Sequence, residues 1–593
     1  MLFYKYDFSS IYIPYYLIFT YLVYYFLFSE QPEEVILTND ELQLCDSSIT
    51  TPSTSSSHQI STLETSIPST SRILPPRRSR TLEPSTNLNV SEINLTKRSI
   101  LSQEPSLKRL KMKSDDLSNF IIKTSMSQKE EFDKQIGRYI YATNSSFMSV
   151  EHPHFKKMVR FLRPGYNPPS RNAIGNIILE TVYSEELESC KKALSGQTVS
   201  VDFDGWSNIH HEPIICISLI TENSGCYLVK TIDTSGSSHT IDYLGKLALE
   251  TILEVEHEFN VKICSFVTDN AANMNGLRKK LLEHNENLIA YGCSAHIANL
   301  LAHDLDIPHV KNPIIEIVKH IRNNHSAAAA YKEAGGKKLI LPNETRWNSV
   351  ADCLDLYIKN WPILANMKLP KAIESKITDV NLRGNGKELL SRLKPISVAL
   401  DKLQRDNTKI SDAVEIWKDL ENELRDLLHE REELSDRFRS RYNQAIQDSH
   451  IVSNMLDPRY LGARLSDDEY DRVINFVGNK FPSLLPIIMK LKGRSSPFDN
   501  PHIFKETLLK EITPCEWWKS MGNKISVDIL NTIKIFLTGS ATSASVERIF
   551  SKFGLVHSKL RNKLGVDKAS KLVFLYKTLN EKTDFSENSE YSN

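Results

Sequence analysis

The chain has 593 residues, with 73 Lys and Arg against 73 Asp and Glu, so its formal net charge is zero. Its length is enough for about three or four domains. The balanced charge excludes a protein that is basic along its whole length, although opposed local patches can cancel. The eight cysteines form no CxxC pair, so neither a disulfide framework nor a common zinc finger is expected.

Residues 1–29 form an unusually apolar segment. Phe8–Phe28 carries no charged residue and is long enough to span a bilayer, but it lacks the small-residue cleavage site of a signal peptide. Three interpretations stay open: a membrane anchor, a buried hydrophobic arm, or an upstream segment wrongly joined to the coding frame. We favour the third, because nothing downstream is typical of an extracellular protein.

Residues 30–115 are predicted to be a disordered linker. They are rich in Ser, Thr and Pro and poor in aromatic residues, so they cannot bury enough apolar surface to offset the entropy of ordering. Two basic clusters, Arg77–Arg80 and Leu107–Lys113, are either nuclear-import signals or solvated charge runs.

A small α-helical domain is predicted for residues 116–195. Phe120–Ser145, Pro153–Leu162 and Arg171–Leu194 carry apolar residues at helical spacing, and Pro164–Arg171 interrupts that pattern. This domain would either bind DNA or brace the next domain, and the second is the safer expectation.

The hydrophobic period changes in residues 196–305. Turn residues separate three strands of a predicted antiparallel meander, and helices then alternate with two buried strands. The predicted elements are strands at Gln197–Phe203, Pro213–Thr221 and Cys226–Thr234, a helix at Thr240–Phe259, a strand at Val261–Thr268, a helix at Asn273–Glu286, a strand at Leu288–Gly292 and a helix at Ala295–Asp304. The expected order is therefore β-β-β-α-β-α-β-α.

The remaining chain is predicted to be helical. Residues 306–510 are too long for a loop and are expected to be an α-helical insertion, with clear helical patterns at Pro308–Asn323, Ser411–Tyr442, Ile451–Leu456 and Phe476–Leu491. Residues 511–580 add helices at Ser526–Leu537, Ser543–Gly554 and Lys568–Leu579. The apolar stripe in Gly565–Tyr576 either packs into the core or forms a subunit interface, and residues 581–593 are expected to be a disordered tail.

Two aspartates stand where predicted strands end. Asp204 follows VSVDF and Asp269 follows CSFVT, and the carboxyl ends of strands are where α/β sheets usually place ligands and metals. Carboxylates are suitable ligands for the paired Mg²⁺ ions of phosphoryl transfer. The structural alternative is that Asp204 caps a turn and Asp269 caps the next helix. Asp202 shares a strand face with Asp204, so the pattern does not separate these two.

Five motifs follow one another along the chain: DGWS at Asp204–Ser207, VTDNAANM at Val267–Met274, CSAHIANLLAHDL at Cys293–Leu305, ETRWNS at Glu344–Ser349 and ATSASVERIFS at Ala541–Ser551. Over roughly Asp116–Leu579 this ordered set resembles the hAT superfamily of cut-and-paste DNA transposases, including its BED-finger domesticated relatives. The resemblance implies an α/β fold: a ribonuclease H-like mixed sheet interrupted by a long α-helical insertion. It also implies a central region of the DUF659 type, a C-terminal dimerisation region and a nuclear location.

The resemblance assigns roles to individual residues. Asp204, Asp269 and Glu547 would be the catalytic carboxylates and would hold Mg²⁺ or Mn²⁺. His296, Arg346 and Trp347 would contact DNA, with Trp347 stacking on a displaced base and Arg346 holding a phosphate. The purely structural alternatives are a hydrogen-bonded core histidine for His296, a core aromatic for Trp347 and a solvated helix carboxylate for Glu547.

The implied function is that of an hAT-like transposase, or a protein derived from one, that cleaves DNA and transfers strands. It would form a dimer or a larger oligomer through residues 511–580, and neither a small-molecule substrate nor a membrane is expected as a partner. The alternative is a catalytically silent, domesticated regulator that dimerises and binds DNA or chromatin. Nothing before Asp116 offers Cys and His pairs at zinc-finger spacing, which favours the regulator, whereas the intact acidic triad favours the enzyme.

Overall fold

The computed structural model describes residues 124–590, apart from 344–346, 559–560 and 562–563. The apolar segment 1–29, the linker 30–115 and its basic clusters lie outside the described residues. All described residues belong to one compact unit, Arg109–Asn593. Within them the fold is mixed α/β and mostly helical, and no helix is long and apolar enough to cross a membrane.

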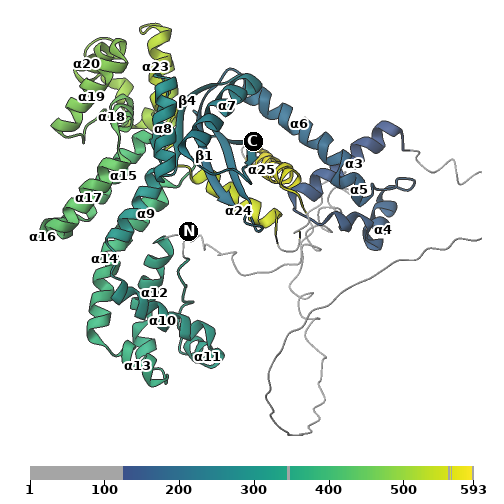
Figure 1. Cartoon of the computed structure of the whole chain (residues 1–593), viewed down its shortest axis with the longest axis horizontal. Coiled ribbons are helices and arrows are strands. Elements are labelled where there is room, and N and C mark those ends of the chain that lie inside the picture. The colour runs from purple at the N-terminus through teal and green to yellow at the C-terminus, as the bar shows by residue number, and fades with distance from the viewer. Residues whose placement is uncertain (1–123, 344–346, 559–560, 562–563, 591–593) are drawn as a thin grey trace, which may run out of the picture. The chain divides into compact units, whose positions relative to one another are not determined.

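A five-stranded mixed sheet is the centre of the fold (Figure 1). Its strands are β1 (Thr198–Ser207), β2 (Pro213–Thr221), β3 (Cys226–Asp233), β4 (Lys262–Thr268) and β5 (Ile289–Gly292). The strand order is β3-β2-β1-β4-β5, with β1, β2 and β3 antiparallel and with β4 and β5 parallel to β1. Short turns give the antiparallel pairs, and helical crossovers give the parallel ones. The predicted order of strands and helices is confirmed.

Helices cover both faces of the sheet. They are α7 (Ile241–Phe259) and α8 (Ala272–His284) on one face, and α23 (Val527–Thr538), α24 (Ala544–Val556) and α25 (Val566–Glu590) on the other. The last three come from the far end of the chain. The sheet is therefore complete only after the long helical segment has returned, as the predicted insertion requires.

Strand β1 carries two kinds of buried side chain in alternation. Val199, Val201 and Phe203 pack against α7 and α8, whereas the even-numbered residues from Ser200 to Asp204 point to the other face, as the two-residue period of a strand requires. Asp202 and Asp204 are both buried there. The strand therefore places two carboxylates in the interior, beneath α24.

The N-terminal helices share a core with the C-terminal ones. They are α3 (Met126–Ala142), α4 (Pro153–Leu162), α5 (Arg171–Gly175) and α6 (Ile177–Leu194). Ile140, Ile174 and Leu179 lie in the same apolar cluster as Leu572 and Val573 of α25. The expectation that this region braces the sheet domain agrees with this packing. The apolar stripe in Gly565–Tyr576 is buried in the same cluster, which decides between the two interpretations left open for it.

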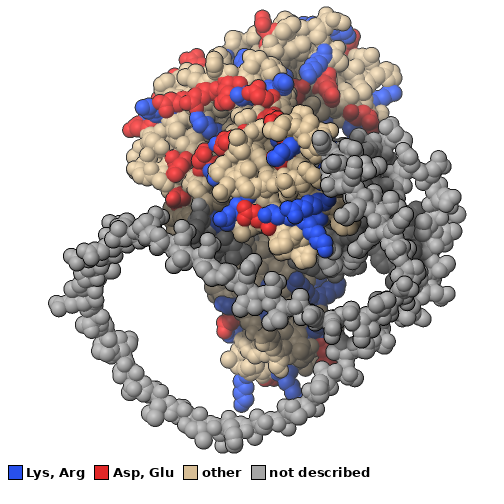
Figure 2. All heavy atoms as spheres, turned by 90° about the vertical axis from the view of Figure 1, so that its right-hand side faces the viewer, with Lys and Arg blue, Asp and Glu red and all other residues tan. Residues whose placement is uncertain are grey.

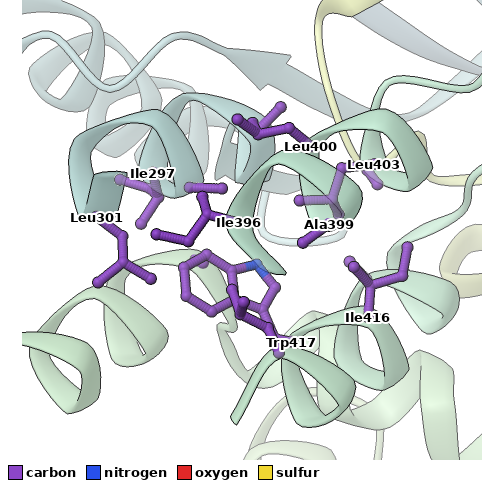
Figure 3. Close-up of a cluster of buried hydrophobic side chains, with 14 of the residues drawn as sticks. Ile297, Leu301, Ile396, Ala399, Leu400, Leu403, Ile416 and Trp417 are labelled. Atoms are coloured by element: carbon purple, nitrogen blue, oxygen red, sulfur yellow. The ribbon is translucent and has the colours of Figure 1, made fainter. Parts of the chain in front are cut away.

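The helical segment after β5 begins with α9 (Ser294–Asp304) and has its own large core. Its further helices are α10 (Pro308–Asn323), α11 (His325–Glu333), α12 (Trp347–Ala365), α13 (Lys371–Ile377), α14 (Val380–Leu403), α15 (Ile410–Glu423), α16 (Arg425–Glu430), α17 (Glu432–Ala445), α18 (Asp448–Leu456), α19 (Asp467–Lys480), α20 (Leu485–Lys492), α21 (Glu506–Glu511) and α22 (Pro514–Lys519). At the centre of this core, Trp417 of α15 packs among Ile297 of α9 and Ile396 of α14 (Figure 3).

Several predicted elements have different bounds in the structure. The predicted helix at Ser411–Tyr442 is three helices, interrupted at Leu424 and at Arg431, whose backbone is extended and whose guanidinium pairs with Glu388 at 2.6 Å. The predicted helix at Phe476–Leu491 is interrupted before Pro482, which disfavours helical geometry in the residue that precedes it.

The helix predicted at Arg171–Leu194 is interrupted at Asn176. Residues 581–590, expected to belong to a disordered tail, continue the backbone of α25.

Trp417 provides a test of the packing at the core of the helical segment. Its side chain is fully buried, and its indole Nε1 donates a hydrogen bond of 2.8 Å to Ser294 Oγ. We expect Trp417→Ala to lower the free energy of unfolding by about 3–5 kcal/mol, because it leaves a cavity in the core. Ser294→Ala should cost only about 1–3 kcal/mol, because it removes one partner of a buried hydrogen bond. Chemical denaturation of both variants measures the difference, and equal losses would contradict the cavity argument.

Candidate active site

The two predicted aspartates lie at the same edge of the sheet. Strand β1 is the central strand and pairs in parallel with β4, with Asp202 opposite Val267. Asp204 lies two residues after Asp202, and Asp269 lies two residues after Val267, so the two aspartates occupy matching positions on adjacent strands. Asp204 itself lies inside β1, paired with Cys216 of β2, and not after the strand as predicted, because the β1–β2 hairpin extends to Ser207.

Helix α24 brings the third predicted carboxylate to this edge. Its first turn docks onto β1 through serine hydroxyls: Ser543 donates to Asp204 Oδ2 at 3.5 Å, and Ser545 donates to Asp202. Ser545 Oγ also lies 3.2 Å from Ser218 Oγ on β2. Glu547 belongs to this first turn and is half-buried, at the border of the buried face of the helix. The structure therefore brings Asp204, Asp269 and Glu547 into one region.

The junction of β5 and α9 fastens the loop after β4 to the start of α24. The backbone N–H of Cys293 donates to Thr268 O at 2.7 Å, and the side-chain amide of Asn270 donates to Cys293 O at 2.8 Å. The N–H of Ser294 donates to Ala541 O at 3.1 Å. These bonds hold the segments that carry Asp269 and Glu547 against each other.

His296 lies in the first turn of α9 and is half-buried beside this junction. The backbone amides of His296 and Ser543 both face the Cys293 thiol, whose pKa is nonetheless raised to about 11 by burial. A thiol with this pKa stays protonated near neutral pH, so Cys293 is not activated as a nucleophile. The Cys-x-x-His pair is thus a structural junction whose histidine lies at the edge of the site.

Asp204 is in an acidic environment. Burial is the largest influence on its carboxyl and raises its pKa to about 7, with further increases from the negative charges of Asp269 and Glu547. The Gly205 N–H and the Ser543 hydroxyl oppose this shift. No cation of the described residues is among these main influences. The negative charges of Asp269 and Glu547 thus disfavour ionisation of Asp204.

Asp202 has the same pKa, raised to about 7 by burial, but different neighbours. Its hydrogen bond from Ser545 and the positive charges of Lys409 and Arg548 lower the pKa. Lys409 is buried and donates to Thr221 O at 3.0 Å and to Thr538 O at 3.4 Å. The structure thus separates the two aspartates that the sequence pattern left equivalent: Asp202 lies near cations, and Asp204 lies near carboxylates.

Asp269 accepts hydrogen bonds through both its side chain and its backbone carbonyl. Its Oδ1 accepts a hydrogen bond of 3.0 Å from Ala271 N, just before α8, so the capping alternative is partly correct. Its backbone carbonyl accepts a hydrogen bond of 2.7 Å from Arg278, which is buried on α8 and also donates to the Thr268 hydroxyl.

The sequence reasoning missed Arg278, because Arg-Lys-Lys in a helix is typical of a solvated face. The available signal was its position four residues after Met274, which places both residues on the same, buried face of the helix.

One of the residues expected to contact DNA, Trp347, is not part of this cluster. Arg346 lies outside the described residues. Trp347 begins α12 and packs edge-on against His303 at 5.7 Å between ring centroids, with the Lys311 ammonium 4.5 Å from its ring. These contacts, together with its packing against the helical core, agree with the alternative of a structural aromatic.

The chemistry of the carboxylates fits a hard divalent cation, because carboxylate oxygens are the ligands that Mg²⁺ prefers. Their side chains are not drawn together into a coordination shell, however. Across the described ranges, no group of three or more His, Cys, Asp or Glu side chains could hold a metal ion. Repulsion between like charges, which already raises the pKa of Asp204, opposes such gathering unless a cation is bound.

Two family models match this region. The hAT family C-terminal dimerisation region matches residues 498–579, which include Glu547, and DUF659, a domain of unknown function, matches residues 169–321, which include Asp204 and Asp269. This chain is an hAT-family transposase-like protein. The two matches cover the two separate segments that meet at the sheet edge.

This hAT-like protein is also similar to a curated relative, "Putative transcriptional regulator tpeD" of Talaromyces stipitatus. The two are 25% identical over 181 residues, which cover 28% of this chain and 21% of the relative. The chain therefore spans about a fifth of that relative's length.

The buried carboxyl of Asp204 should affect how stability depends on pH. Its pKa is about 7 in the folded protein and near 3.8 when exposed, so the folded state binds more protons between about pH 4 and 7. The free energy of unfolding should therefore fall as the pH rises through this window. Asp204→Asn should remove up to about 1 kcal/mol per pH unit of this decline.

Denaturation in EDTA at a series of pH values measures the change. Asp468→Asn, at an exposed position on α19, is the matched control and should leave the decline intact. If Asp204→Asn behaves like that control, the carboxyl of Asp204 is not perturbed.

Gly292 tests the junction beside the site. A Cβ at this position would overlap the side-chain amide of Asn270, which is held by its bond to Cys293 O. We expect Gly292→Ala to lower the free energy of unfolding by about 1–3 kcal/mol through overpacking. The same substitution in an Asn270→Ala background should cost clearly less, because the clash is gone. Equal costs in the two backgrounds would show that Asn270 is not the obstacle.

Proposed function

We propose that this hAT-like protein is a transposase that cleaves DNA and transfers strands by two-metal phosphoryl transfer. Asp204, Asp269 and Glu547 would be the ligands of two Mg²⁺ or Mn²⁺ ions. The observation that carries the proposal is the meeting of these three carboxylates, from two adjacent strand ends and a distant helix, close enough that the charges of Asp269 and Glu547 raise the pKa of Asp204.

The strand order supports a ribonuclease H-like fold for this proposal. An antiparallel meander of three strands, with β1 in the centre and two parallel strands beyond it, is the arrangement that the resemblance implies. The catalytic carboxylates would then occupy the edge of the sheet at which β1 and β4 end, where α/β folds generally bind their ligands.

Bound divalent ions would supply the Lewis acid that activates an attacking water or DNA 3′-hydroxyl and stabilises the leaving oxygen. The side chains of this protein would do the rest. Ser543 and Ser545 would fix the first turn of α24 on β1, so that Glu547 faces Asp204. Arg278 would hold the end of β4 by its bond to Asp269 O. His296, at the edge of the site, would contact DNA or orient a catalytic group.

The partners would be DNA and a second copy of the chain, in the nucleus. Residues 511–580, which overlap the matched dimerisation region at 498–579, would provide self-association. Arg346 and Trp347 would be further DNA contacts. A second candidate function is a catalytically silent regulator that binds DNA or chromatin, and the similarity to the Talaromyces stipitatus protein named "Putative transcriptional regulator tpeD" favours it.

A cleavage assay separates the two candidates. Full-length protein is given end-labelled DNA that carries the sequences flanking its own gene, with Mg²⁺ or with EDTA. We expect nicks or hairpins with Mg²⁺ alone, and a loss of at least about 100-fold in Asp204→Asn, Asp269→Asn and Glu547→Gln, because each removes a ligand of the proposed ions. The control Asp468→Asn should cleave normally.

A binding measurement supports the same test without relying on activity. Mg²⁺ should raise the melting temperature of the parent protein and not that of Asp204→Asn, because a ligand stabilises the state that binds it. DNA binding without cleavage and without any effect of Mg²⁺ on stability would favour the regulator and overturn the enzymatic proposal.

A further inference from the structure

Helix α4 and the residues around it concentrate positive charge in a chain whose net charge is zero. Residues 152–179 contain five Lys and Arg and no Asp or Glu: Lys156, Lys157, Arg160, Arg163 and Arg171. Arg163 and Arg171 contact their own protein: the first lies over the Phe132 ring, and the second pairs with Glu151 at 3.8 Å. In the part of the chain that the structure describes, no carboxylate lies within ion-pair distance of the other three.

Helix α4 lies at the surface of the molecule. None of its residues is fully buried, and Lys157 and Arg160 are exposed while Lys156 is half-buried. Figure 2 looks onto this side of the molecule and shows a band of Lys and Arg side chains apart from the main row of Asp and Glu. The three cations and the 84% exposed Phe161 line an open hollow of about 440 Å³, together with Glu151 and Pro153.

We propose that this surface binds the phosphate backbone of duplex DNA, with Lys156, Lys157 and Arg160 as the phosphate contacts. The proposal rests on the function proposed above and names the surface that would hold the DNA outside the carboxylate site. A ten-residue helix is about 15 Å long and can lie along roughly four phosphates of one strand, which are spaced about 3.4 Å along the duplex axis.

The composition of the helix favours DNA over a lipid surface. A helix that lies in a membrane presents a continuous apolar face. On α4, only Phe161 and Leu162 are strongly exposed among the apolar residues, whereas Phe155 packs against the cluster shared with α25. The remaining exposed positions are cations, histidines and a proline, which suit a polyanion better than an acyl layer.

The end of α3, which precedes the surface in the chain, is hydrogen-bonded to the helix that carries Glu547. Asn144, between α3 and α4, donates to Leu555 O of α24 at 3.1 Å, and Arg561 donates to Asn144 O at 2.7 Å. Asn580 of α25 donates to Ala142 O at 2.9 Å. These bonds attach the segment that precedes α4 to α24 and α25.

The test compares two triple variants of the full-length protein. Lys156→Ala, Lys157→Ala and Arg160→Ala together remove the proposed contacts, and Lys319→Ala, Lys332→Ala and Lys338→Ala remove the same charge from exposed positions on and after α10 and α11. Both should fold, because alanine suits helices and no changed side chain is buried. Melting temperatures of both variants check this.

Fluorescence anisotropy of a labelled duplex of arbitrary sequence is recorded in EDTA between about 50 and 200 mM salt. For the α4 variant we expect binding to be at least about tenfold weaker, and the slope of log K against log salt to fall in magnitude by about 2–3, since each phosphate contact contributes about 0.9. The control variant should keep the parent slope.

An unchanged slope and affinity in the α4 variant would overturn the proposal. So would the outcome in which duplex binding is unaffected but binding to vesicles containing an anionic phospholipid is lost, because that result assigns the surface to a membrane. Because the assay excludes divalent ions, it is independent of cleavage. The α4 variant could bind DNA more weakly and with less salt dependence although the parent protein never cleaves DNA. That result would support the DNA-binding surface while the enzymatic proposal fails.

Discussion

The burial of two carboxylates on one strand is the constraint around which this fold is arranged. Asp202 and Asp204 occupy the central strand of the sheet and face inward, where an unsatisfied charge costs several kcal/mol. The chain meets this constraint only in part: the serines at the start of α24 donate to one oxygen of each carboxylate, and Asp202 Oδ1 has no hydrogen-bond partner among the described residues. Two residues in the first strand thus take hydrogen bonds from a helix more than three hundred residues downstream.

The same constraint explains how a long helical segment can interrupt the sheet. Both ends of this segment lie against the sheet, and buried hydrogen bonds hold them there. Lys409 bridges β2 and α23, Tyr291 OH donates to Ser540 O at 2.8 Å, and Trp417 donates to Ser294. The helical segment can therefore have its own core without separating from the sheet, because each junction is satisfied by a specific donor and acceptor.

The sequence predicts the part of this arrangement that depends on local pattern. The change from helical to strand period, the meander and the αβ units follow from apolar spacing, and the motifs around Asp204, Asp269 and Glu547 predict which strand ends and helix meet. What the pattern could not predict depends on long-range packing. The roles of Ser545 and Lys409, and the difference between Asp202 and Asp204, arise only when α24 lies on β1. The interruptions at Leu424 and Arg431 likewise reflect tertiary contacts that override helical charge patterning.

The packing of α25 also limits how the matched dimerisation region can work. The apolar stripe that seemed suited to a subunit interface is buried against α3 and α6 of the same chain. A second copy could reach it only by displacing these helices, which would expose a large part of the apolar core. Within residues 498–579, this packing leaves exposed apolar side chains elsewhere, such as Val527 at the start of α23 and Leu555 at the end of α24. The carbonyl of Leu555 also accepts the hydrogen bond from Asn144 that attaches the N-terminal helices. The matched region therefore serves first to join the N-terminal helices to the sheet of its own chain.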